Sequence, residues 1–296
     1  SMATTGNPLH TGDFDDDGWA DLIIGDPGGS RGAGEVSVLL GPIAPTSGAD
    51  AVAVAESIFY GAASGTDFGG AALAVPLWGE ATSTVVVGAS QSRSGKGHVS
   101  VFDSGLSRSM SESDRSFSIT ASLTATALGT TLASGDLDGD GAADLLVCGP
   151  TARITGDASG LCGVVTRRMS TDTDVADLSI QITAAMWRDN VVAQMGARVS
   201  IGDVDGDGQD DLVVGARGSQ VEGVVRAGAA LVYYGPLASG VSNAGDAQAL
   251  VSSTSTDASI GHDVFIGESA TPDGRAVLMV GASELTSVAI IVAGGW

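Results

Sequence analysis

The sequence predicts an all-β protein made of repeated small sheets, and three observations point to this class. Short stretches of alternating apolar and polar residues recur along the 296 residues, with glycine-rich turns between them. No stretch shows the 3.6-residue apolar period of a long amphipathic helix. The same order of motifs also returns about every 60 residues, which is typical of a repeat architecture.

Five copies of the repeat account for nearly the whole chain. When Asp13, Val75, Asp136, Asp203 and Gly267 are taken as equivalent points, the spacings are 62, 61, 67 and 64 residues. A repeated four-stranded sheet is the blade of a β-propeller. We therefore predict one β-propeller domain over residues 1–296, with five blades of about 60 residues each and an incomplete last blade. The predicted blades span residues 8–61, 68–121, 128–183, 195–253 and 260–296.

Within each copy the strands are expected in a fixed order, for which the fourth copy is an example. An inner strand (198–202) leads into a loop, and the strand "DLVVG" (211–215) follows. A glycine-rich turn leads to "GAALVYYG" (228–235), and "QALVSS" (248–253) ends the copy. The fifth copy has no fourth segment after "SVAIIVAGGW" (287–296), so we expect an open strand edge there that favours self-association.

Three of the loops between first and second strands carry the same series of aspartates. They read "GDFDDDGWAD" (12–21), "GDLDGDGAAD" (135–144) and "GDVDGDGQDD" (202–211). Carboxylates at loop positions 1, 3, 5 and 9 with a glycine at position 6 suit calcium, which takes six to eight oxygen ligands around a sharp turn. The expected ligands are these four carboxylates and the carbonyl oxygen of position 7. In chain order they are Asp13, Asp15, Asp17, Trp19 and Asp21; Asp136, Asp138, Asp140, Ala142 and Asp144; and Asp203, Asp205, Asp207, Gln209 and Asp211.

Two other interpretations of the acidic loops are less favoured. An EF-hand loop ends in a bidentate glutamate at position 12 and lies between two helices. Position 12 here is Ile24, Val147 or Val214, each inside an apolar run that is too short for a helix. Bare acidic turns are disfavoured because three copies occur in register. We therefore expect three calcium ions, and none at the loops of the second and fifth copies.

These motifs resemble the FG-GAP repeats of the integrin alpha-subunit propeller and its bacterial relatives. The resemblance rests on "DFGGAALAV" (67–75), on the turns "GDP", "GAS" and "GAR" that start at Gly25, Gly88 and Gly215, and on the acidic loops. It covers residues 8 to 293. It implies a disc with a ligand-binding face formed by the connections between blades. Rings of that family usually have seven blades, whereas this chain has material for five.

Charge and residue types exclude several classes of function. The net charge is −22, with 35 acidic and 13 basic residues, which disfavours nucleic acid and anionic membranes as partners. Three calcium ions would bring this charge to −16. None of the histidines, His10, His98 and His262, has the spacing of a zinc site. The string "GGSRG" (28–32) matches a nucleophile elbow, but a strand follows it where the elbow needs a helix. We expect no catalytic activity.

The two cysteines predict a disulfide. Cys148 ends the second strand of the third copy and Cys162 begins the third strand, so the two ends of this hairpin should meet. Two free thiols in a reducing compartment are the alternative. A disulfide together with calcium loops favours an extracellular or cell-surface location.

Tryptophans are the candidate partner-binding residues. Trp19 and Trp78 are expected on loops of one face, and Trp187 in a connection between blades. The alternative for these rings is packing between neighbouring blades. The sequence thus predicts a calcium-stabilised extracellular scaffold for binding or adhesion, with a protein or glycan ligand on one face and no membrane insertion. The alternatives are a glycan-binding, lectin-like propeller and a non-catalytic propeller domain of a larger surface enzyme.

Overall fold

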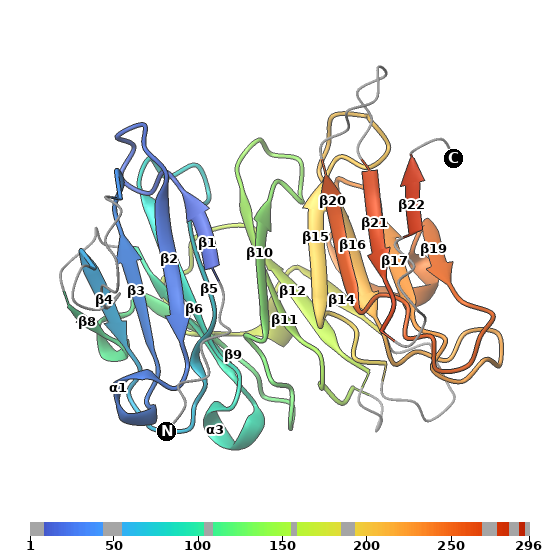
Figure 1. Ribbon diagram of the computed structural model, residues 1–296, viewed down its shortest axis with the longest axis horizontal. Helices are drawn as coiled ribbons and strands as arrows, with labels where there is room; N and C mark the ends of the chain where they lie inside the picture. The colour runs from blue at the N-terminus through green and yellow to red at the C-terminus, as the bar shows by residue number, and fades with distance from the viewer. Residues whose placement is uncertain are drawn as a thin grey trace.

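The computed structural model describes residues 9–43, 55–103, 109–154, 159–184, 193–267, 277–283 and 290–293. Within these ranges the chain forms five sheets of mostly antiparallel strands, and the prediction of an all-β fold is confirmed (Figure 1). The helical segments there are short. They are α1 (Gly29–Gly32), α3 (Ser92–Gly95), and the 3-10 turns η1 (Glu112–Asp114), η2 (Val175–Asp177) and η3 (Ala244–Asp246). None of the described helices has the length and apolar character needed to span a bilayer.

Each of the first four sheets contains four antiparallel strands in the predicted order, from the inner strand outward. Sheet 1 contains β1 (Leu9–Gly12), β2 (Asp21–Asp26), β3 (Glu35–Leu39) and β4 (Ser57–Tyr60). Sheet 2 contains β5 (Phe68–Pro76), β6 (Ser83–Ala89), β7 (His98–Phe102) and β9 (Phe117–Thr120). Sheet 3 contains β10 (Thr131–Gly135), β11 (Asp144–Gly149), β12 (Leu161–Val165) and β14 (Ile180–Thr183). Sheet 4 contains β15 (Arg198–Gly202), β16 (Asp211–Ala216), β17 (Ala229–Tyr233) and β19 (Ala249–Ser252).

Sheet 5 has three strands in the described part of the chain, which are β20 (Asp263–Gly267), β21 (Val277–Gly281) and β22 (Ile290–Ala293). The outer edges of sheets 1 to 3 each receive a further, parallel strand from the following repeat. These strands are β8 (Met110–Ser111), β13 (Thr173–Asp174) and β18 (Gly240–Asn243). They cover edges that would otherwise be free to pair with other chains. Among the described residues no such strand pairs with β19 or β22.

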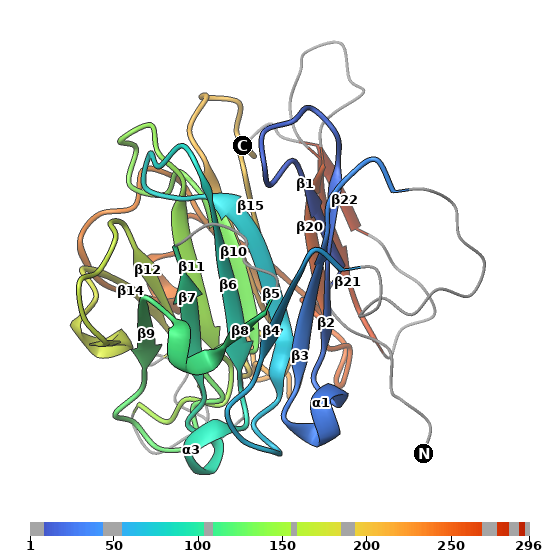
Figure 2. The ribbon, with the colours of Figure 1, turned by 90° about the vertical axis from the view of Figure 1, so that its left-hand side faces the viewer.

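Neighbouring sheets pack face to face through alternating apolar side chains. In β16, Leu212 and Val214 point into a core shared with sheet 3, whereas Val213 joins a core shared with sheet 5. The inner strands β1, β5, β10, β15 and β20 contact one another in this order and follow a curve (Figures 1 and 2). The strands β1 and β20 share no comparable contact. The ring closure and the count of five blades stay predictions.

The two end sheets each keep one apolar face without a neighbouring sheet in the described part of the chain. Met279 has the same position in the second strand as Ile23, Leu146 and Val213, which are 0% exposed, but it is itself 37% exposed. Phe265, opposite Met279 in the sheet, is 54% exposed. The difference follows from position, because no described sheet follows sheet 5.

The glycines of the repeated turns allow close contact between consecutive sheets. A Cβ atom on Gly88 would lie 2.1 Å from the carbonyl oxygen of Gly129, which begins the next repeat. Gly129 itself has a φ of +85°, a conformation that residues with a side chain rarely adopt. In sheet 3 the position of Gly88 is taken by Cys148, whose disulfide with Cys162 packs against Gly196.

Candidate metal centres

The three acidic loops lie on one face of the molecule, at the upper edge in Figure 1. Each loop joins an inner strand to the second strand of sheet 1, 3 or 4, and its last aspartate is the first residue of the second strand. Loop positions 4 and 6 have positive φ in all three, as in Gly139 (+79°) and Gly141 (+89°). This double left-handed conformation makes the sharp turn that allows side chains from both arms of the loop to converge.

The first aspartate of each loop shapes the turn by accepting backbone N–H groups. Asp136 Oδ1 accepts from Gly139 (2.9 Å) and Asp140 (3.0 Å), and its Oδ2 accepts from Gly141 (2.9 Å). Asp203 makes the same three contacts in sheet 4. In sheet 1, Asp13 accepts two of the equivalent N–H groups. The loop backbone is therefore arranged around these carboxylates.

The last aspartate of each loop is a buried anchor. Asp21, Asp144 and Asp211 are at most 1% exposed. Asp211 Oδ2 accepts the N–H of Val204 (2.7 Å), and its Oδ1 accepts the N–H of Gly235 (2.9 Å) in the turn after β17. These bonds tie the loop to its own sheet.

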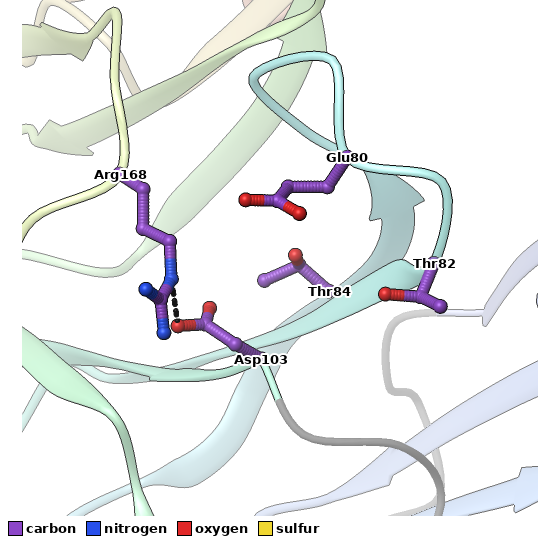
Figure 3. Close-up of a pocket in the computed structure, with 5 residues that line it drawn as sticks. All are labelled: Glu80, Thr82, Thr84, Asp103 and Arg168. Atoms are coloured by element: carbon purple, nitrogen blue, oxygen red, sulfur yellow. Dashed lines mark hydrogen bonds and ion pairs between the residues drawn. The ribbon is translucent and has the colours of Figure 1, made fainter.

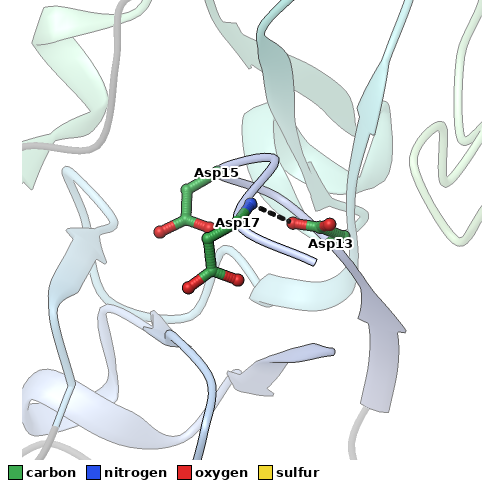
Figure 4. Close-up of side chains that lie close together, drawn as sticks. All are labelled: Asp13, Asp15 and Asp17. Atoms are coloured by element: carbon green, nitrogen blue, oxygen red, sulfur yellow. Dashed lines mark hydrogen bonds between the residues drawn. The ribbon is translucent and has the colours of Figure 1, made fainter. Parts of the chain in front are cut away.

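Carboxylate oxygens gather in each loop at distances that suit one cation. The oxygens of each group lie within 4.8 Å of one another, and the groups are Asp13, Asp15 and Asp17; Asp136, Asp138 and Asp144; and Asp203, Asp205 and Asp211. Figure 4 shows the first group around its loop. All donors are hard oxygens without nitrogen or sulfur, which is the donor set that calcium prefers. The residues therefore fit calcium.

The electrostatics of the loops also favour a bound cation. Loss of hydration and repulsion from Asp17 raise the pKa of Asp15. Burial, followed by repulsion from Asp138, raises the pKa of Asp144 to about 7. Burial is likewise the main cause of the raised pKa values of Asp138 and Asp211. A divalent cation among these groups would stabilise their charged forms.

The structure brings together some of the predicted ligands but does not test the assignment to an ion. The close groups use positions 1, 3 and 5 in the first loop and positions 1, 3 and 9 in the other two. Position 7 (Trp19, Ala142 and Gln209) donates its N–H to the aspartate of position 5 in each loop. The role of the position 7 carbonyls, and that of Asp21, Asp140 and Asp207 as ligands, stay predictions.

The loop of sheet 2 shows that the assumed alignment was wrong by one residue. Val75 pairs with Thr84 as Gly135 pairs with Asp144, so Pro76, and not Val75, is equivalent to Asp136. In sheet 5, Gly267 pairs with Val277 as Gly202 pairs with Asp211, so the same shift applies there. The spacing pattern could not reveal this shift because the second and fifth loops lack the aspartates that define position 1 in the others.

The candidate tryptophans lie in different environments. Trp19 is 58% exposed on the face of the acidic loops. Trp78 is partly buried: its ring packs against Phe117, and its Nε1 donates to the carbonyl oxygen of Val165 (2.7 Å) in sheet 3. These contacts agree with the alternative that the Trp78 ring packs between neighbouring sheets. Trp187 lies outside the described residues.

The structure contains the predicted disulfide and a buried polar chain that the sequence did not indicate. Cys148 and Cys162 are direct partners across β11 and β12, with a Cα–Cα distance of 4.1 Å.

In sheet 2, Ser92 Oγ lies 2.5 Å from His98 Nδ1, and His98 Nε2 contacts the Glu112 carboxylate. All three side chains are buried. Nothing in the spacing of these residues connects them, because the contact depends on η1 folding over β7.

Comparison with known families supports this description. The FG-GAP repeat family model matches residues 6–39 and 195–233, which contain the first and third acidic loops and strands β1 to β3 and β15 to β17. The chain thus contains FG-GAP repeats, and its all-β sheets belong to the propeller class that these repeats build. It is similar in this respect to the integrin alpha-subunit propeller. A search of curated proteins found no match to the chain.

Proposed function

We propose that the protein is a calcium-stabilised extracellular scaffold for binding or adhesion, without catalytic activity. The observation that carries this proposal is the group of three oxygen-rich clusters on one face, each built into the loop between the first two strands of a sheet. The backbone of these loops is organised around carboxylates that repel each other, so a cation would stabilise the folded state directly. The Cys148–Cys162 disulfide supports an oxidising compartment.

The partner is a protein or a glycan bound on one face of the disc. The exposed Trp19 side chain favours the face of the acidic loops as the binding face, because exposed aromatic side chains are enriched at binding sites. The net charge of −22 disfavours nucleic acid as a partner, because binding to phosphates needs a basic surface. Self-association through the edge of β22 is a further expectation, since no described strand pairs with this edge, whereas a fourth strand covers the equivalent edge in sheets 1 to 4. A non-catalytic propeller domain in a larger surface enzyme would have the same features.

Thermal unfolding in excess calcium, in excess magnesium and in excess chelator tests the proposal. Calcium should raise the melting temperature well above the chelated value, and magnesium should do so less, because it prefers strict octahedral geometry with retained waters. Elemental analysis should find three calcium ions per chain. Melting curves that do not depend on calcium would refute the scaffold proposal.

A further inference from the structure

A polar cavity of about 270 Å³ lies on the same face as the acidic loops, between sheets 2 and 3. Its lining consists of Glu80, Thr82, Thr84, Asp103 and Arg168 (Figure 3). Glu80 and Thr82 belong to the β5–β6 loop, Thr84 lies in β6, Asp103 follows β7, and Arg168 follows β12 of the next sheet. The cavity is therefore formed where the loop of sheet 2 meets the neighbouring sheet.

This loop has the length of the acidic loops but different side chains. With Pro76 at position 1, Trp78 occupies position 3, and both replace aspartates of the other loops. Glu80, Thr82 and Thr84 then occupy positions 5, 7 and 9. Gly79 keeps the positive φ of position 4 (+72°). The loop thus retains part of the shape of a metal loop, while two of its four carboxylates are lost and a third is replaced by a hydroxyl.

One polar atom of the cavity, Asp103 Oδ1, is buried without a hydrogen-bond partner in the described part of the chain. Thr84 is 3% exposed, and Figure 3 shows its hydroxyl pointing toward Glu80 and the open space. Asp103 Oδ1 is buried and unpaired, whereas its Oδ2 accepts a hydrogen bond from Arg168 Nε (2.6 Å). Buried polar groups normally have partners, because desolvation without one costs free energy. The unpaired Asp103 oxygen therefore indicates a ligand that can donate a hydrogen bond to it.

The chemistry of the lining limits the class of this ligand. Two carboxylates repel anions, and the guanidinium of Arg168 opposes a metal cation. An ammonium group would pair with Glu80 and Asp103 but would leave the threonine and arginine donors unused. Sugar hydroxyls donate and accept hydrogen bonds at once, so they can satisfy both kinds of group. The volume is just below the about 300 Å³ at which pockets for drug-sized ligands begin, which suits one small polar unit.

We propose that this cavity binds one neutral sugar unit of a glycan. The inference rests on the proposed function as a calcium-stabilised binding scaffold and specifies its ligand and its site. Asp103 Oδ1 and Glu80 accept hydrogen bonds from sugar hydroxyls, and Arg168 donates to them. The Thr84 hydroxyl at the base of the cavity does both.

Saturation-transfer NMR with the calcium-loaded protein tests the proposal. The probes are the methyl glycosides of galactose, mannose and N-acetylglucosamine, each titrated separately, and methylammonium as the cationic comparison. At least one glycoside should bind saturably with millimolar affinity. Thr84→Val, which keeps the shape but removes the hydroxyl, and Glu80→Gln should each weaken this binding about tenfold or more, which corresponds to about 1.4 kcal/mol. Glu222→Gln, at an exposed position outside the cavity lining, is the control and should bind as the unmodified chain does.

The outcomes separate this inference from the proposed function. Absence of binding by all three glycosides, binding of methylammonium alone, or unchanged glycoside binding in both cavity variants would overturn the sugar site. Melting curves of the same samples with calcium and with chelator report on the scaffold independently. A calcium-stabilised protein that binds no glycoside would overturn only the sugar site, whereas a protein without calcium stabilisation would overturn the scaffold.

Discussion

The Asp144 carboxylate at the start of β11 should change stability in opposite directions with and without calcium. Its Oδ2 accepts the backbone N–H groups of Leu137 (2.8 Å) and Asp138 (3.1 Å). An asparagine can keep both bonds through its single carbonyl oxygen, but it carries no charge. Asp144→Asn therefore removes an anionic ligand from the calcium-loaded protein, and it removes an unfavourable buried charge from the chelated protein.

The size of each effect can be worked from the site. At calcium concentrations 100-fold above the dissociation constant, one site contributes about 2.7 kcal/mol by mass action. If Asp144→Asn loses most of this binding free energy, its melting temperature in calcium should fall by about 5–10 °C. In chelator above pH 7 the raised pKa of Asp144, about 7, makes its ionised form unfavourable in the folded state. After reduction for solvent screening, the asparagine should gain about 1 kcal/mol, or about 2–4 °C.

Calorimetry of the variant in excess calcium and in excess chelator measures both effects. Asp211→Asn is the matched control, because Asp211 uses one oxygen for Val204 and the other for Gly235. An amide cannot accept with both ends, so this variant should be destabilised under both conditions. Two results would refute the reasoning. One is an equal loss of stability in Asp144→Asn with and without calcium, and the other is no change under either condition.

Three further predictions concern pH, the disulfide and the buried polar chain. The folded pKa of Asp144 is raised from 3.8 to about 7, so the chelated protein should lose stability as pH rises through this window, and calcium should abolish the loss. Replacement of Cys148 and Cys162 by alanine should cost about 3 kcal/mol, because the disulfide closes a loop with a sequence separation of 14. Glu112→Gln should cost about 2 kcal/mol or more, because the Glu112 carboxylate is buried against His98.

Each of these predictions has a control and a contradicting result. Chelated melts between pH 4 and pH 7.5 that stay flat, or that rise with pH, would contradict the pH prediction. The cysteine variant is compared with the reduced unmodified chain, and equal stability of oxidised and reduced protein would remove the role of the disulfide. Ser113→Ala lies next to Glu112 on an exposed part of η1 and serves as the control for Glu112→Gln. Equal effects of these two changes would show that the buried carboxylate is not important.

The sequence alone determined the repeat, the strand order and the acidic loops. Asp136 and Asp144 are eight residues apart in one loop, so their approach depends on a local turn. Glycines such as Gly139, which has a positive φ, indicate this turn in the sequence. Cys148 and Cys162 were predictable for a related reason, because the two strands of a hairpin place them opposite each other.

The tertiary structure alone decided the features that depend on packing between elements. The register of β5 against β6 made Pro76 equivalent to Asp136, and no local pattern marks this pairing. The cavity combines Thr84 and Asp103 of sheet 2 with Arg168 of sheet 3, and Arg168 lies 65 residues after Asp103 in the chain. Such contacts arise from the angle and distance at which two sheets pack. Those quantities are set by the whole apolar interface between the sheets, and the short-range spacing of residues does not record them.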